Sequence, residues 1–123
     1  MKKVIAIVLA VSACITVFAQ ERTFLTKAEV ENLANGKKWT YVRTSDSNKI
    51  VWDLRGGGDL FANNRTAGAA DAGTWSVNEQ GRLCTKWRGN SRDGCFALFK
   101  DGDKLKWVGA GNLKGPGIEL EVE

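Results

Sequence analysis

The residues able to do chemistry are few, because the 123-residue sequence contains no histidine. Ser-His-Asp and Cys-His nucleophile systems, H-E-x-x-H metal helices and histidine-ligated zinc or haem sites are therefore excluded. Asp53 and Asp59 form a candidate carboxylate pair of the kind that glycoside hydrolysis needs, although a place on a strand face or in a turn explains each equally well. Since no recognised catalytic motif is present, the sequence predicts a protein that is not an enzyme and takes no cofactor.

Two short motifs resemble ligand loops but lack essential residues. A phosphate-binding P-loop requires a lysine and a hydroxyl residue after its glycines, and neither follows Gly56, Gly57 and Gly58 in the required place. Asp101, Gly102 and Asp103 lack the further spaced oxygens and the terminal glutamate of a calcium loop. Both motifs are typical of tight turns instead, and no metal site is expected.

The N-terminal segment has the pattern of a signal peptide over residues 1–19. Lys2 and Lys3 precede an apolar run that begins at Val4, and small or apolar residues occupy the two positions read by a signal peptidase, Val17 and Ala19. The apolar stretch is shorter than the roughly 20 residues of a membrane-spanning helix, so no membrane span is expected. The sequence thus predicts a periplasmic or secreted protein whose single domain covers residues 20–123.

Cys14 leaves a second form of export open. The residues before it loosely match the box that precedes a lipidated cysteine, so the protein is either cleaved after Ala19 or lipidated at Cys14. The apolar run continues past Cys14 through Phe18, which favours cleavage after Ala19. Loss of Lys2 and Lys3 with the signal lowers the formal net charge from +4 to +2, a balance that gives no indication of nucleic-acid binding.

Cys84 and Cys95 are the only cysteines of the predicted mature chain. An even pair in an exported domain is typical of a disulfide, whereas a redox or metal pair needs Cys-x-x-Cys spacing or further ligands. We expect these two residues to be bonded, with a stabilisation on the order of 3 kcal/mol from the short loop that the bond closes.

One helix and then a series of strands are expected along the mature chain. Residues 26–36 form a helix with Thr26 as N-cap, Glu29 completing a capping box and Gly36 as the left-handed stop. Beyond it the apolar residues alternate, which predicts strands, while residues 63–72 read as an exposed polar loop. Leu60 and Phe61 open one extended segment, and the other strands are expected over residues 39–44, 50–54, 74–77, 82–87, 95–99, 104–108 and 118–123.

The fold class that follows is mainly β with one N-terminal helix. About seven strands, spaced at intervals of about ten residues, predict an antiparallel meander that forms a small barrel or a strongly curved sheet, lipocalin-like in outline. The helix is expected to cover an open end or one face, and a mature chain of about 104 residues has room for one hydrophobic core.

Residues 73–95, GTWSVNEQGRLCTKWRGNSRDGC, and the following FALFKDGDKLKWV resemble a family of small exported bacterial proteins of unknown function. That family has a GTW strand, a Gly-Arg-Leu-Cys strand and a second cysteine that opens the next strand. The upstream TKAEVENLANGKKW is similar to its opening helix. The resemblance supports the fold and the disulfide and implies no catalytic residues. The triple glycine and the polar loop after it depart from the pattern.

Two binding functions are compatible with these features. Five tryptophans exceed what so small a core needs, which favours a non-catalytic module that holds a small apolar or amphipathic ligand in the mouth of a barrel. The alternative is an exported protein-interaction module, for example an inhibitor of an enzyme such as lysozyme. The candidate binding surface lies around the polar loop between the two cysteines and consists of Trp87, Arg88, Arg92 and Phe96.

Overall fold

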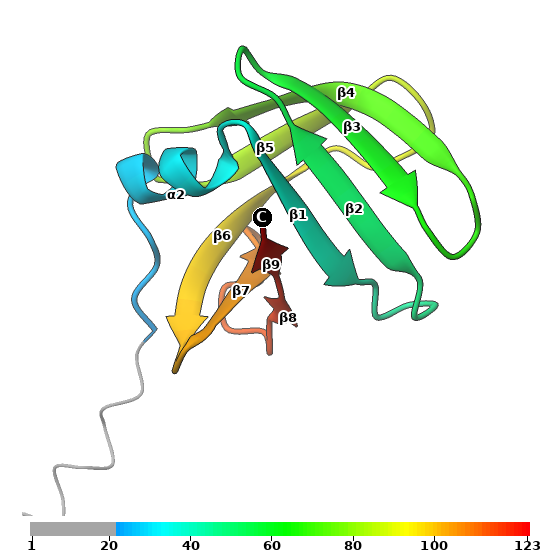
Figure 1. Cartoon of the computed structure of the whole chain (residues 1–123). Coiled ribbons are helices and arrows are strands. Elements are labelled where there is room, and N and C mark those ends of the chain that lie inside the picture. The colour runs from blue at the N-terminus through cyan, green and yellow to red at the C-terminus, as the bar shows by residue number, and fades with distance from the viewer. Residues whose placement is uncertain (1–21) are drawn as a thin grey trace, which may run out of the picture.

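The computed structural model describes residues 22–123, and the predicted signal peptide and Cys14 lie outside this range. Within these residues, one helix precedes nine antiparallel strands, which confirms the mainly β fold class (Figure 1). The elements are α2 (Lys27–Ala34), β1 (Lys37–Val42), β2 (Lys49–Leu54), β3 (Asp59–Asn64), β4 (Ala70–Val77), β5 (Leu83–Trp87), β6 (Gly94–Asp101), β7 (Lys104–Gly109), β8 (Ile118–Glu119) and β9 (Glu121–Val122).

The strands form a nearly closed, barrel-shaped sheet. Strands β1 to β7 pair in chain order, and the C-terminal segment then lies between the two ends of the sheet. β8 pairs with β7, the Leu120 amide donates to the Leu105 carbonyl at 2.8 Å, and β9 pairs with β1. The expected last strand is therefore divided at Leu120, because its two halves complete opposite edges of the curved sheet.

The helix α2 closes one end of the barrel. Thr26 and Glu29 form the expected capping box, and Gly36 takes the left-handed conformation, with φ at 75°, that ends the helix. Val30 and Ala34 are fully buried in the same cluster as Leu54, and the indole Nε1 of Trp39 donates to the Leu33 carbonyl at 2.8 Å. Figure 1 shows α2 at the end opposite the β1–β2 and β3–β4 loops.

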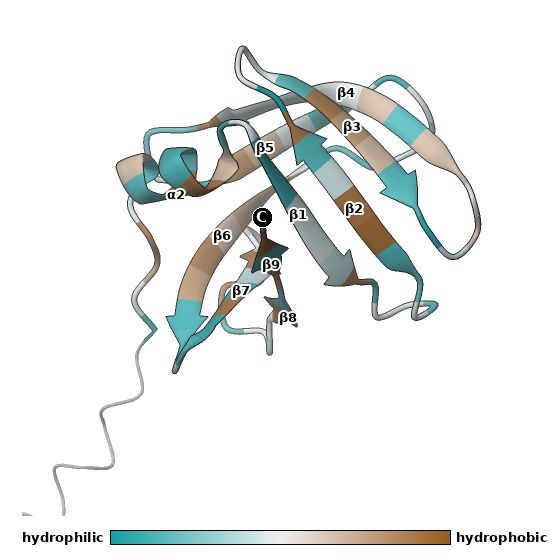
Figure 2. Cartoon of the chain, in the orientation of Figure 1, coloured by the Kyte–Doolittle hydropathy of each residue, from teal (hydrophilic) through white to brown (hydrophobic). Residues whose placement is uncertain are grey.

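The core fills the interior of the sheet. Buried residues alternate with less buried ones, as along β2, and hydrophilic residues gather where β6 meets β7 (Figure 2). The aromatic part of the core is a set of packed indoles. The largest side chains with less than 2% of their surface exposed are Trp39, Leu54, Leu60, Leu83, Leu98 and Val30.

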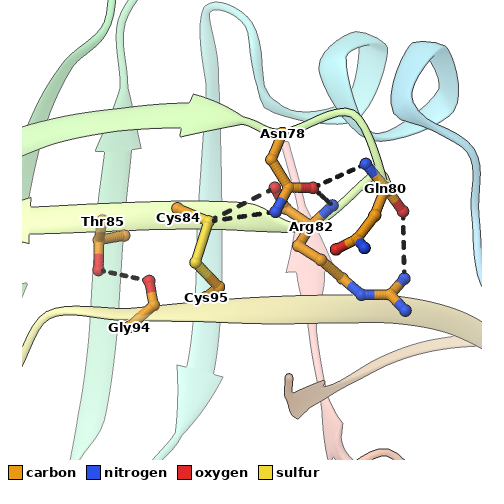
Figure 3. The surroundings of a disulfide bond; sticks show 7 residues. All are labelled: Asn78, Gln80, Arg82, Cys84, Thr85, Gly94 and Cys95. Carbon is orange, nitrogen blue, oxygen red and sulfur yellow. Dashed lines mark hydrogen bonds between the residues drawn. A yellow bond between two sulfur atoms is a disulfide. The ribbon is translucent and has the colours of Figure 1, made fainter. Parts of the chain in front are cut away.

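The expected disulfide joins Cys84 of β5 to Cys95 of β6, which face each other directly across the two strands (Figure 3). This ladder holds only three residue pairs, whereas β6 and β7 share six. Next to the bond, the buried hydroxyl of Thr85 donates to the Gly94 carbonyl at 3.4 Å. The covalent link thus reinforces the shortest ladder among the seven consecutive strands.

The prediction of an exposed loop over residues 63–72 is wrong at both ends. β3 continues to Asn64 and β4 begins at Ala70, with Asn63 opposite Ala70 and Ala62 opposite Asp71. Small and polar residues have low strand propensity, but pairing with flanking strands overrides it. Only residues 65–69 remain as the connection.

Candidate functional site

The end of the barrel opposite α2 is open and carries four connections. They are the β1–β2 turn, residues 65–69 between β3 and β4, residues 88–93 between β5 and β6, and the long β7–β8 connection. Because the strands alternate in direction, the last residues of β1, β3, β5 and β7 meet at this end. Side chains at these strand ends therefore surround one opening.

A hollow of about 640 Å³ lies in this opening, and we call it the mouth hollow. Its aromatic residues come from four strands: Tyr41, Trp52, Trp87 and Phe96. Its polar residues come mainly from the strand ends and loops: Arg43, Asn64, Asp71, Asn90, Ser91 and Arg92. Aromatic surface with a few polar groups around it is the usual composition of a small-molecule site.

The barrel interior below the mouth hollow is occupied by tryptophan. Trp52 is 4% exposed, and its ring centroid lies 5.0 Å from that of Trp107 and 5.5 Å from that of Trp87. Trp39 packs beneath them at 5.9 Å from Trp107. These edge-to-face contacts leave the indoles in favourable aromatic geometry. A ligand therefore has room at the mouth, above the indole cluster.

A second hollow of about 380 Å³ lies beside the first, at the seam where β1 and β8 meet, and we call it the seam slot. The pairing of β1 with β9 ends at Thr40, so the last residues of β1 have no ladder partner on β8, which pairs with β7. The slot is mainly apolar, and its apolar side chains are Tyr41, Phe96, Trp107, Val108, Pro116 and Ile118. Tyr41, Arg43 and Phe96 line both hollows.

Asp71 holds the β5–β6 loop against β4. Its carboxylate oxygens accept hydrogen bonds from the backbone amides of Gly89 at 2.9 Å and Ser91 at 3.0 Å, and from that of Ala72 at 2.7 Å. A hydrogen bond from the Ser91 side chain, followed by the bonds from these amides, lowers the pKa of Asp71. A side chain on Gly89 would collide with this carboxylate, since a Cβ there would lie 2.6 Å from Oδ1.

Two further side chains order the neighbouring connections. Asn64 accepts from the amides of Thr66 and Ala67 at 3.0 and 2.8 Å, an Asx turn that shapes the β3–β4 connection. Asp46 binds the Arg43 guanidinium at 2.6 Å, and this ion pair lowers the pKa of Asp46. Three of the four connections around the mouth are thus preorganised, which reduces the entropy lost on binding.

The electrostatics of the mouth hollow are balanced. Arg43 is neutralised by Asp46, and the positive charge of Arg92 is matched by the negative charge of Asp71. Among residues 22–123, no hydrogen bond occupies the Asn90 amide or the Arg92 guanidinium. Burial raises the pKa of the Tyr41 phenol, so this side chain stays neutral. The rim therefore offers free hydrogen-bond donors without a net charge.

Three of the four residues in the predicted binding surface line the mouth hollow: Trp87, Arg92 and Phe96. Arg88 is absent from the lining, and its backbone amide donates to the Ala72 carbonyl at 2.8 Å. Asn64 and Asp71 were missed because they fell in the presumed loop. The Asn64-Arg-Thr sequence is a typical Asx-turn signal, whereas nothing local distinguishes Asp71.

The candidate carboxylates Asp53 and Asp59 lie elsewhere. Asp53 binds Arg55 at 3.2 Å near the helix-covered end, and Asp59 is exposed at the start of β3. Neither lines the mouth hollow or the seam slot. Within the described part of the chain, no three His, Cys, Asp or Glu side chains are grouped as metal ligands would be.

The helix in the described range is too short to cross a membrane. Comparison of the chain with protein-family models, with curated proteins and with solved structures gave no match. The family resemblance noted from the sequence therefore remains a prediction.

Proposed function

We propose that this protein is a non-catalytic binding domain that holds a small ligand in the mouth hollow. The observation that carries the proposal is the opening of about 640 Å³ in which partly exposed rings of Trp87, Phe96 and Tyr41 share a cavity with polar side chains on ordered loops. Exposed aromatic surface gains free energy when a ligand covers it. The ordered loops lower the cost of forming the complex.

The chemistry of the lining supports binding rather than catalysis. Asp71 is the only carboxylate that lines the mouth hollow in the described chain, and its oxygens are held by backbone amides. A general base works best with a pKa near the operating pH, but the pKa of Asp71 is lowered. Asp71 is thus suited to holding the loop and unsuited to accepting a proton.

Intrinsic tryptophan fluorescence tests the proposal, since Trp52 and Trp87 lie at the site. We expect one member of a panel of fatty acids, haem and cell-wall fragments to change the emission saturably. Trp87→Ala should abolish the change. Trp75→Phe is the matched control, because the Trp75 indole donates to the Arg55 carbonyl at the helix-covered end. A panel without any saturable change in the wild-type protein would refute the proposal.

The disulfide also supports export to the periplasm or the medium, because such bonds persist in oxidising compartments. Mass spectrometry of the native protein tests this part. Cleavage after Ala19 should leave Gln20 at the N-terminus and a mass two hydrogens below that of the reduced chain. Recovery of the protein with residues 1–19 attached would contradict export by signal cleavage.

A second candidate is a protein-interaction module or enzyme inhibitor, and the β5–β6 loop favours it. The exposed residues Arg88, Asn90 and Arg92 are carried on a loop that Asp71 and Asp93 fix to the sheet, the latter accepting from the Trp87 amide at 2.7 Å. Inhibition of lysozyme by the mature domain, lost in an Arg88→Ala/Arg92→Ala variant, would favour this function over small-ligand binding.

A further inference from the structure

We propose that the mouth hollow and the seam slot form one bipartite site for a neutral amphiphile, with an uncharged sugar or polyol head in the mouth hollow and an alkyl chain in the seam slot. This inference rests on the proposed function and specifies its ligand. Four features of the described residues support it: the shared wall of the hollows, the filled interior, the apolar slot and the charge balance of the mouth.

The two hollows adjoin each other at a shared aromatic wall. Phe96 stacks on Trp107 with centroids 4.5 Å apart, and Tyr41 meets the same indole at 4.9 Å. Tyr41 and Phe96 line both hollows, while Trp87 lines only the mouth hollow and Trp107 only the seam slot. One molecule that occupies both hollows therefore contacts the rings of Tyr41 and Phe96 and also the Arg43 side chain, which is paired with Asp46.

The filled interior determines where an alkyl chain can lie. Trp39, Trp52 and Trp107 are at most 4% exposed, so a chain cannot enter the barrel along its axis as it would in a hollow barrel. The seam slot is the neighbouring apolar space. At its edge the guanidinium Nη1 of Arg22 donates to the carbonyls of Leu113 and Gly115, at 2.9 and 2.7 Å, which fixes the β7–β8 connection that carries Pro116.

The head must satisfy the polar side of the mouth hollow. The amide of Asn64 uses its oxygen for the Asx turn and keeps its Nδ2 donors, and Asn90 and Arg92 add donors that no described residue occupies. Hydroxyl oxygens accept from such groups, and the apolar face of a sugar ring covers an aromatic side chain. The opposite charges of Asp71 and Arg92 favour an uncharged head over an anion or a cation.

Alkyl β-glucosides of increasing chain length, used below their micelle concentrations, provide the test. Indole N–H signals in nitrogen-15 NMR spectra report on each tryptophan separately. We expect octyl glucoside to shift the signals of Trp87 and Trp107, while those of Trp39 and Trp75, both hydrogen-bonded near the helix-covered end, stay in place. Affinity should rise up to about fourfold for each added methylene and level off once the slot is full.

Variants separate the two halves of the site. Ile118→Asn should remove the dependence on chain length and leave the weak binding of methyl glucoside unchanged. Val42→Asn is the matched control, because Val42 is 54% exposed and lines neither hollow. The chain-length series on the wild-type protein tests the slot independently if Ile118→Asn does not fold.

The outcomes distinguish this inference from the proposed function. Shifts of the Trp87 signal by octanoate but not by octyl glucoside would overturn the neutral head and leave small-ligand binding intact. Equal affinity for methyl and octyl glucosides would overturn the role of the seam slot. Absence of any shift with the glucosides, octanoate and the fluorescence panel would overturn both proposals.

Discussion

Removal of the Cys84–Cys95 disulfide should destabilise the domain and loosen the mouth. The bond crosslinks β5 and β6, whose ladder has only three residue pairs and carries Trp87 and Phe96 at the site. The perturbation is the double substitution Cys84→Ala/Cys95→Ala, which leaves no single thiol to form intermolecular bonds.

The magnitude follows from the short loop that the bond closes. For a sequence separation of 11, the chain-entropy relation gives about 2.8 kcal/mol of stabilisation at 25 °C. With an unfolding entropy of about 2.1 cal/mol/K per residue, a domain of this length should lose roughly 10–15 °C in Tm. The effect arises mainly in the unfolded chain, since Cys84 and Cys95 remain direct partners across the ladder.

Circular dichroism of residues 20–123 during thermal unfolding measures this change, with the oxidised wild-type protein as reference. Wild-type protein in excess reductant is the control and should approach the Tm of the double variant. A Tm that falls by less than about 3 °C in both samples would refute the reasoning, because the unfolded hairpin would then be equally restricted without the bond.

Three further substitutions test the remaining elements. Thr26→Ala removes the helix cap and should lower the free energy of unfolding by about 1 kcal/mol, measured by urea denaturation. Thr26→Ser keeps the capping hydroxyl and should retain most of this stabilisation. Trp39→Ala empties the base of the indole cluster, and because Trp39 is fully buried we expect a loss of about 3–5 kcal/mol in the same assay; a loss below 1 kcal/mol would contradict its place in the core. Asp71 has a pKa lowered by its hydrogen bonds, so its contribution to stability is present above the pKa of the unfolded state and is lost as the pH falls through the lower folded-state pKa. The Tm difference between the wild-type protein and Asp71→Asn should therefore shrink between pH 6 and pH 3, and a constant difference would argue against the ionised carboxylate as the loop anchor.

Local sequence determined the elements that have helix-capping residues or a clear alternation of apolar and polar side chains. The capping box of Thr26 and Glu29, the left-handed Gly36 and the alternation of Leu105 and Trp107 with lysines are all present in the structure. These features depend on neighbours within a few residues, so a single sequence reveals them. The pairing of Cys84 with Cys95 was also predictable, because no other cysteine lies in residues 20–123.

The candidate site depended on long-range pairing that no local pattern contains. Trp87 and Phe96 were identifiable from the sequence as part of one surface. Tyr41 and Asn64 join them only because the antiparallel sheet brings the ends of every second strand to the same opening. Asp71 became a loop anchor through its register opposite Ala62 and its bonds to amides 18 and 20 residues away. The closure through Leu120 likewise required both edges of the sheet, since one short segment pairs with strands from opposite ends of the chain.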